Sequence, residues 1–157
     1  MSKVAICMAD GCEEIEGLTV VDVLRRGGME IDMVSISGDP YVTGSHNISF
    51  CADKLISEVN WAEYDGIVLP GGIPGTPNLL ANPEVTDALK LFAAEEKLIA
   101  AICAAPSVLG QVGLLEGKKA TSYPGFAEKM PGCQYQTDAV VRDGNIITSR
   151  GMGTAIA

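Results

Sequence analysis

The sequence predicts an α/β fold of the flavodoxin-like kind: a doubly wound, mostly parallel sheet with helices on both faces. Two observations lead to this prediction. Short runs of almost continuous apolar residues, typical of strands buried on both faces, alternate with segments that repeat apolar residues at helical spacing. The length of 157 residues also fits a single three-layer domain, which we expect to cover residues 1–157.

The predicted strands are short apolar runs bounded by turn residues. The less regular stretch 40–50 is expected to hold a hairpin. In chain order the strand-forming runs are KVAICM (3–8), EIDMVSI (30–36), GIVLPGG (66–72, apolar from 67 to 69), LIAAI (98–102), KATSY (119–123) and NIITS (145–149).

Helical periodicity predicts three helices between these strands. The first ends at Gly27, because glycine favours a helix C-terminus. Asn82 is the expected N-cap of the second, and Pro83 fits its first turn. The apolar residues of this second helix share one face and should be buried: Val85, Ala88, Leu89 and Phe92. The three helices are expected over 17–28, 82–96 and 105–113.

The charge balance argues against two classes of partner. The chain carries 20 acidic and 11 basic residues, for a formal net charge of -9. A surface of this sign repels phosphate backbones, so we expect no nucleic-acid partner. It is equally unsuited to an anionic membrane surface.

Two apolar segments need to be weighed as targeting or membrane segments. The run Val4–Ala9 is too short for a signal peptide and is followed at once by acidic residues. Residues 98–115 carry no charge, but Pro106 and Gly110 favour a strand, a turn and a helix over a membrane span. We therefore expect a cytoplasmic protein without a membrane segment.

The cysteines indicate reduced thiols rather than a disulfide or zinc framework. Their number is five, which is odd, and no C-x-x-C pair occurs. His46 is the single histidine, so a Cys/His cluster for zinc is not expected and no metal is assigned.

Ligands of parallel α/β sheets bind at the carboxyl ends of the strands, so the segments that follow the strands are the places to search. Five such exits combine a glycine or proline turn with a polar or reactive group. They are ADGCEEIEG (9–17), PGGIPG (70–75), CAAP (103–106), YPG (123–125) and SRGMGT (149–154). In a parallel sheet, all five should meet at one edge.

Cys103 is the most specific candidate, since it falls at a turn from strand to helix. Backbone N–H groups and the dipole of the following helix favour a thiolate there, in a geometry similar to a nucleophile elbow. The alternative is a buried cysteine that acts as a small apolar residue. The pattern alone favours neither interpretation.

The other exits also allow two interpretations each. Glu13, Glu14 and Glu16 are either solvated charges at a helix N-terminus, or include a carboxyl close to the thiol whose pKa burial would raise. Gly71 and Gly72 either form an ordinary tight turn or bring backbone N–H groups to a reacting oxygen. Arg150 could lie near an anion, although this signal is weak by itself.

Four of these stretches, in order across the chain, resemble the signatures of the ThiJ/PfpI family, also called the DJ-one family: ADGCEEIE, VLPGGIPG, AAICAAPSVL and TSRGMGT. The resemblance implies a flavodoxin-like fold, usually in a homodimer. It implies that Cys103 is the nucleophile, that Glu16 is its carboxyl partner, and that the N–H groups of Gly72 and Ala104 line the oxyanion site. Members are associated with cofactor-independent conversion of glyoxals to hydroxy acids, with deglycation, and with redox sensing or chaperone-like protection.

The sequence departs from this family at three places. Many members have a histidine after the strand that follows the elbow, where this chain has Tyr123. His46 lies instead in GSHN, a stretch that often carries arginine, so a Cys–His dyad is not expected. Relatives usually continue past GMGT into a further helix, whereas this chain ends at Ala157; we therefore expect the last layer to be short or incomplete.

The resulting hypothesis is a glyoxalase- or deglycase-type enzyme that uses Cys103 on small dicarbonyls or their adducts, without a cofactor. Two alternatives stay open. One is a redox-sensing or chaperone-like protein in which Cys103 is oxidised to a sulfinate. The weaker one is a thiol hydrolase or amidase.

Overall fold

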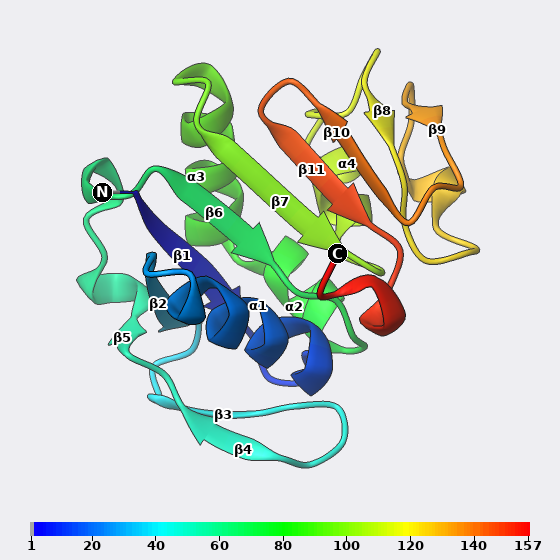
Figure 1. Cartoon of the computed structure of the whole chain (residues 1–157). Helices are drawn as coiled ribbons and strands as arrows, with labels where there is room; N and C mark the ends of the chain where they lie inside the picture. The colour runs from blue at the N-terminus through cyan, green and yellow to red at the C-terminus, as the bar shows by residue number, and fades with distance from the viewer. Residues whose placement is uncertain (1) are drawn as a thin grey trace.

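A seven-stranded sheet forms the centre of the computed structural model, which describes residues 2–157 (Figure 1). The strand order is β10-β11-β7-β6-β1-β2-β5, and every neighbouring pair is parallel except β10 with β11. The strands are β1 (Lys3–Met8), β2 (Glu30–Ser35), β5 (Lys54–Leu55), β6 (Gly66–Leu69), β7 (Leu98–Ile102), β10 (Val140–Asp143) and β11 (Ile146–Ser149). The predicted fold class is confirmed.

Strand β1 shows why the apolar runs are continuous. It pairs with β6 along one edge and with β2 along the other, and it contributes buried residues on both of its faces. Its side chains alternate between two clusters of buried residues, as the period of a strand requires. Val4, Ile6 and Met8 belong to one cluster, whereas Ala5 and Cys7 belong to the other.

Helices cover both faces of the sheet. Helix α1 (Glu14–Arg26) lies on one face, and α2 (Gly75–Ala81), α3 (Pro83–Ala94) and α4 (Pro106–Gln111) lie on the other (Figure 1). The predicted cap of α3 is confirmed, because Asn82 Oδ1 accepts a 2.9 Å hydrogen bond from the Glu84 N–H. The predicted buried face of α3 is confirmed as well.

The structure differs from the sequence prediction in four elements named below. Helix α1 begins at Glu14 rather than residue 17, because the Glu13 carboxyl caps it by accepting the Ile15 N–H. Helix α2 and the antiparallel strand β10 were not predicted. Of KATSY, only β8 (Lys119–Ala120) is a strand, and it pairs with β9 (Gln134–Tyr135) outside the main sheet. The expected hairpin is confirmed as β3 (Tyr41–Thr43) and β4 (Ser49–Cys51).

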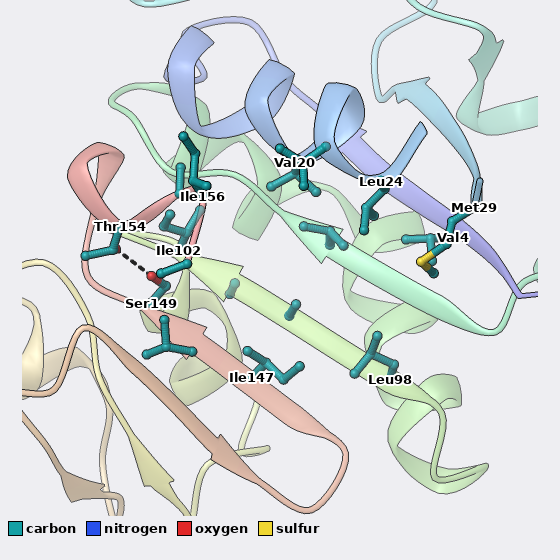
Figure 2. Close-up of a pocket in the computed structure, with 17 residues that line it drawn as sticks. Val4, Val20, Leu24, Met29, Leu98, Ile102, Ile147, Ser149, Thr154 and Ile156 are labelled. Carbon is teal, nitrogen blue, oxygen red and sulfur yellow. Dashed lines mark hydrogen bonds between the residues drawn. The ribbon is translucent and has the colours of Figure 1, made fainter. Parts of the chain in front are cut away.

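An apolar groove of about 360 Å³ lies between α1 and strands β6, β7 and β11. Figure 2 shows Val20 and Leu24 of α1 on one side and Ile147 of β11 on the other. Beyond Ser149 the chain makes one 3₁₀ turn, and residues 154–157 line one end of the groove. No helix within residues 2–157 is long and apolar enough to cross a membrane.

Candidate active site

Cys103 lies in a sharp turn between β7, which ends at Ile102, and α4, which begins at Pro106. Its φ is +65°, a left-handed conformation that costs a non-glycine residue about 1–3 kcal/mol. Two backbone hydrogen bonds hold it there: its N–H donates to the Ser149 carbonyl at 2.9 Å, and its carbonyl accepts the Tyr123 N–H at 2.8 Å. The predicted elbow geometry is therefore present.

Glu16 projects from the first turn of α1 to the same point. Its side chain is buried, and its Oε1 accepts the Gly71 N–H at 3.1 Å. The carboxyl lies beside the Cys103 side chain, because a single Cβ built at Gly71 would touch both Glu16 Oε1 and Cys103 Cβ. The structure thus joins two residues that are 87 positions apart in the chain (103 minus 16).

The glycines after β6 make this approach possible. A Cβ at Gly71 would lie 2.6 Å from Glu16 Oε1 and 2.7 Å from Cys103 Cβ, so any side chain here would separate the pair. Gly72 has a φ of +96°, and a Cβ there would lie 2.4 Å from the Glu13 nitrogen. Both glycines are required by close packing as well as by the turn.

Two backbone N–H groups in the segments around Cys103 and Gly71 match the expected oxyanion donors. The Ala104 N–H directly follows Cys103 and lowers the pKa of its thiol. The Gly72 N–H, next to Gly71, has no protein acceptor among residues 2–157. Such N–H groups are the donors that an oxyanion site uses.

The expected effect of the helix terminus on the Cys103 thiol is present but is outweighed. Burial and, after it, the charge of Glu16 raise the pKa of the thiol, to about 12 in all. The Ala104 N–H lowers it, but α4 has only six residues and does not offset the loss of water around the sulfur.

Of the two interpretations of the acidic cluster, Glu16 fits the carboxyl close to the thiol. Burial and the charge of Glu13 raise the pKa of Glu16, contacts with the Cys103 thiol and the Gly71 N–H lower it, and the net value is about 7. At neutral pH the carboxyl is therefore divided between its protonated and ionised forms. Such a group can both donate and accept a proton.

Glu14 has a different environment, although it too is buried. Its carboxylate accepts the backbone N–H groups of His46, at 2.9 Å to Oε2, and of Ile48, at 3.1 Å. Burial by itself would raise the pKa of Glu14, but the hydrogen bonds together lower it. Glu14 thereby fastens the β3–β4 hairpin to the start of α1.

His46 lies at this hairpin contact and not against Cys103. Its exposed ring places Nδ1 3.1 Å from Glu14 Oε1 and 3.4 Å from Glu13 Oε2. The hydrogen bond to Glu14 and the charge of Glu13 raise the pKa of His46. The GSHN segment lies outside the five strand exits in the sequence, but the hairpin brings His46 back to the first exit.

One cluster of potential metal ligands occurs within residues 2–157. It consists of Glu13, Glu14 and His46, each with one ligand atom within 4.8 Å of the others. Both oxygens of Glu14, however, already accept backbone N–H groups. The cluster is therefore explained as a structural contact.

Tyr123 and Arg150 complete the edge. Tyr123 is half exposed, and a Cβ at Gly151 would lie 3.4 Å from its ring and 4.0 Å from Glu16 Oε2. Arg150 Nη1 is buried without a hydrogen-bond partner among residues 2–157. The hydrogen bond from the Cys103 N–H shows that the Ser149 carbonyl, which the sequence did not single out, supports the elbow.

A family model described as the DJ-1/PfpI family matches residues 2–157. The chain belongs to the DJ-1/PfpI family. The predicted family is thereby confirmed.

The relatives differ in how much of their length the chain spans. "Protein DJ-1 homolog B" of Arabidopsis thaliana is 42% identical over 98% of this chain, but the chain spans 36% of that protein. "Deglycase PH1704" of Pyrococcus horikoshii is 35% identical over 94% of this chain and 89% of its own length.

Solved structures of the family share the whole fold. A cysteine-to-alanine mutant of the DJ-1 superfamily protein STM1931 from Salmonella typhimurium has a TM-score of 0.95 and 36% identity, covering 99% of this chain and 84% of that one. "Toxoplasma gondii DJ-1, oxidized" also has a TM-score of 0.95, with 40% identity over 99% of this chain and 85% of that one.

Proposed function

We propose that this DJ-1/PfpI chain is a cofactor-independent enzyme of the glyoxalase or deglycase type, with Cys103 as nucleophile and small dicarbonyls or their adducts as substrates. The close approach of the Cys103 and Glu16 side chains across Gly71 is the observation that carries the proposal. A relative of nearly the same length that is named a deglycase supports it.

The first step forms a carbon–sulfur bond. The Cys103 sulfur attacks the aldehyde carbon while its proton passes to the ionised Glu16 carboxylate, and the carbonyl oxygen becomes an alkoxide. The N–H groups of Gly72 and Ala104 stabilise this charge. The proton then moves from Glu16 to the alkoxide, which leaves a neutral hemithioacetal and an ionised carboxylate.

The second step moves a proton between neighbouring carbons. Glu16 removes the proton from the former aldehyde carbon and returns it to the adjacent carbon, by way of an enediolate. The hydroxyl proton of the first carbon passes to the oxygen of the second. The first carbon is oxidised by two electrons and the second is reduced by two, so no outside oxidant is needed. The product is a Cys103 thioester of a 2-hydroxy acid.

Water completes the reaction. Its oxygen bonds to the acyl carbon, the carbon–sulfur bond breaks, and the sulfur regains a proton as the 2-hydroxy acid leaves. The sum is a dicarbonyl plus water giving a 2-hydroxy acid. An adduct of the dicarbonyl with a thiol or an amine enters the same path when that thiol or amine leaves with a proton.

The pKa values of Cys103 and Glu16 favour proton transfer to Glu16 as the sulfur attacks. Because the pKa of Cys103 is raised to about 12, the resting sulfur carries its proton and needs a base. Glu16, with a pKa of about 7, is ionised often enough at neutral pH to be that base. Proton transfer and sulfur attack are therefore coupled in the proposal.

The test is incubation of the purified chain with methylglyoxal, with D- and L-lactate followed by NMR. Cys103→Ser should abolish lactate formation while the fold, measured by circular dichroism, is kept. Cys51→Ser is the matched control, because Cys51 is exposed and lies in β4. Undiminished turnover in Cys103→Ser would refute the mechanism.

A second candidate function is redox sensing, in which Cys103 is oxidised to a sulfinate. It is favoured by a relative of 40% identity whose structure is described as oxidised, and by the Glu16 carboxyl, which in its protonated form can donate a hydrogen bond to a sulfinate oxygen. Peptide mass spectrometry after graded peroxide tests it: Cys103 should be modified before Cys12, which is buried.

We also propose that the chain forms a homodimer, as its family resemblance implies. Light scattering at micromolar concentration should give twice the chain mass of 16.4 kDa. A monomer under these conditions would contradict it.

A further inference from the structure

A second cavity, of about 220 Å³, lies beside the candidate site, between α2, α4 and the segment 126–129. We call it the side pocket. Its walls continue from the segments that border Cys103. Ile73 directly follows Gly72, and Ser107 donates its hydroxyl to the carbonyl of Ala104. The side pocket therefore adjoins the turn that holds Cys103.

The third wall begins at Tyr123. The Tyr123 N–H is held by the Cys103 carbonyl, and the Phe126 N–H in turn donates to the Tyr123 carbonyl. Phe126 lines the side pocket. The walls formed by α4 and by segment 126–129 are thus joined to the elbow by the chain or by hydrogen bonds.

The side pocket combines apolar walls with a polar base. Ile73 and Leu80 expose 56% and 38% of their surfaces although both are large aliphatic residues, and Phe126 faces the same space. Such apolar surface is stabilised when a ligand covers it. By contrast, Thr76 is 96% buried, and its Oγ1 has no hydrogen-bond partner among residues 2–157. A buried hydroxyl without a partner is costly, so it indicates a missing hydrogen-bonding group.

Lys129 supplies a charge at the opening. Its ammonium lies 5.8 Å from the centre of the Phe126 ring. Within the described residues no carboxylate approaches this ammonium to 4 Å, although the chain has 20 acidic residues. In a chain with a net charge of -9, an unpaired lysine beside a cavity favours an anionic ligand.

We propose that the side pocket binds the part of the substrate that does not react, an apolar alkyl or aryl group that carries a carboxylate. The apolar group lies against Ile73, Leu80 and Phe126. The carboxylate pairs with Lys129, and Thr76 supplies a hydrogen bond deeper in the pocket. This inference rests on the proposed function, because it extends the substrate bound at Cys103.

The experiment compares three dicarbonyls with the intact chain: methylglyoxal, phenylglyoxal and 4-carboxyphenylglyoxal. Each should give its 2-hydroxy acid. We expect the carboxylated substrate to have the highest kcat/KM. Lys129→Gln should lower that value about fivefold, the scale of one exposed ion pair, and leave methylglyoxal unchanged. Lys90→Gln, the same charge change at an exposed position of α3, is the control.

Thr76→Val removes the hydroxyl and keeps the shape of the side chain. It should lower kcat/KM for both aryl substrates about fivefold, as expected for one hydrogen bond, without an effect on methylglyoxal. Because the change removes an unpartnered hydroxyl, the fold should be no less stable. Equal kcat/KM values for wild type and both variants with every substrate would overturn the proposal.

A binding measurement separates this proposal from the proposed function. 4-Acetylbenzoate and acetophenone are unreactive ketones, and their binding is followed by chemical shifts of the intact protein. Even if the wild type turned over no dicarbonyl, 4-acetylbenzoate should shift resonances of residues 73–80 and 126–129. The Lys129→Gln substitution should weaken the binding of 4-acetylbenzoate about fivefold. If no resonance of these segments shifts, the side pocket does not bind this class of ligand.

Discussion

Glu14 and Glu16 lie two positions apart in the first turn of α1, and both are buried, yet their acidities move in opposite directions. Glu14 faces the hairpin and accepts hydrogen bonds from its backbone, which lower its pKa. Glu16 faces Cys103, and burial raises its pKa to about 7.

Burial alone does not determine the role of a carboxyl group. The number of N–H groups that donate to the carboxylate determines it, because each hydrogen bond stabilises the ionised form. Glu14, with several donors, holds two parts of the fold together. Glu16, with the Gly71 N–H and a thiol, is available for proton transfer. Glu14 also positions Glu16, because both residues belong to the first turn of α1.

Removing the ionisable group of Glu16 tests its assigned role in proton transfer most directly. Glu16→Gln keeps the shape of the side chain but cannot accept a proton, so kcat/KM for methylglyoxal should fall at least about a hundredfold. Lactate formation measured by NMR checks it. Normal turnover would show that Glu16 is not the base, and would favour the redox function.

Removing Glu14 should act on stability instead. Glu14→Ala leaves the N–H groups of His46 and Ile48 without their acceptor, and should cost about 2 kcal/mol, the scale of hydrogen bonds to a charged group. Urea denaturation measures the loss. Glu84→Ala, an exposed acidic residue in the first turn of α3, should cost less than about 1 kcal/mol. Equal losses in the two variants would contradict the assigned role.

The opposite pKa shifts of Glu14 and Glu16 predict opposite effects of pH on stability. The pKa of Glu16 rises from 4.5 to about 7 on folding, so its stabilising contribution is complete below pH 4.5 and is lost as pH rises through 7. Wild type should therefore lose stability relative to Glu16→Gln between pH 5 and pH 8. For Glu14 the lowered pKa gives the opposite sign: its contribution is lost as pH falls. Urea titrations of both proteins across this range measure the difference, and a constant difference would contradict it.

The smallest effect is expected at His46. Its ring is 67% exposed, and Glu14 is still held by backbone N–H groups when the ring is removed. His46→Ala should therefore keep methylglyoxal turnover within about threefold of wild type, well short of the loss expected for a general base. A hundredfold loss in the lactate assay would assign the ring a part in proton transfer.

The sequence predicts those features that depend on neighbouring residues. The buried face of α3 and its Asn82 cap follow from local spacing, and both are confirmed. Helix α2 was missed because its seven residues include Pro77 and are too few to show a period. Strand β8 was assigned too long, because the stretch 119–123 is apolar enough for a strand while only two residues pair.

The assembly of the candidate site was predictable, but the direction in which the pKa of Cys103 shifts was not. The rule that strand ends meet at one edge brings Glu16, Gly71 and Cys103 together. The pKa of Cys103 depends on how closely distant segments surround the sulfur, and spacing along the chain carries no such information. The contact of His46 with Glu14 likewise depends on the path of a hairpin across the first strand exit.

The elbow at Cys103 is held by a carbonyl 46 residues later in the chain (149 minus 103), whereas its partner Glu16 arrives from the first helix. Strand β11 reaches its place only by pairing with β7, which itself depends on β6 and β1. Contacts between such distant segments form slowly, because a long loop must close before they contribute free energy. The reactive geometry therefore belongs to the fully folded chain, and a partly folded chain, even one rich in helix, would hold its five cysteines without the arrangement that distinguishes one of them.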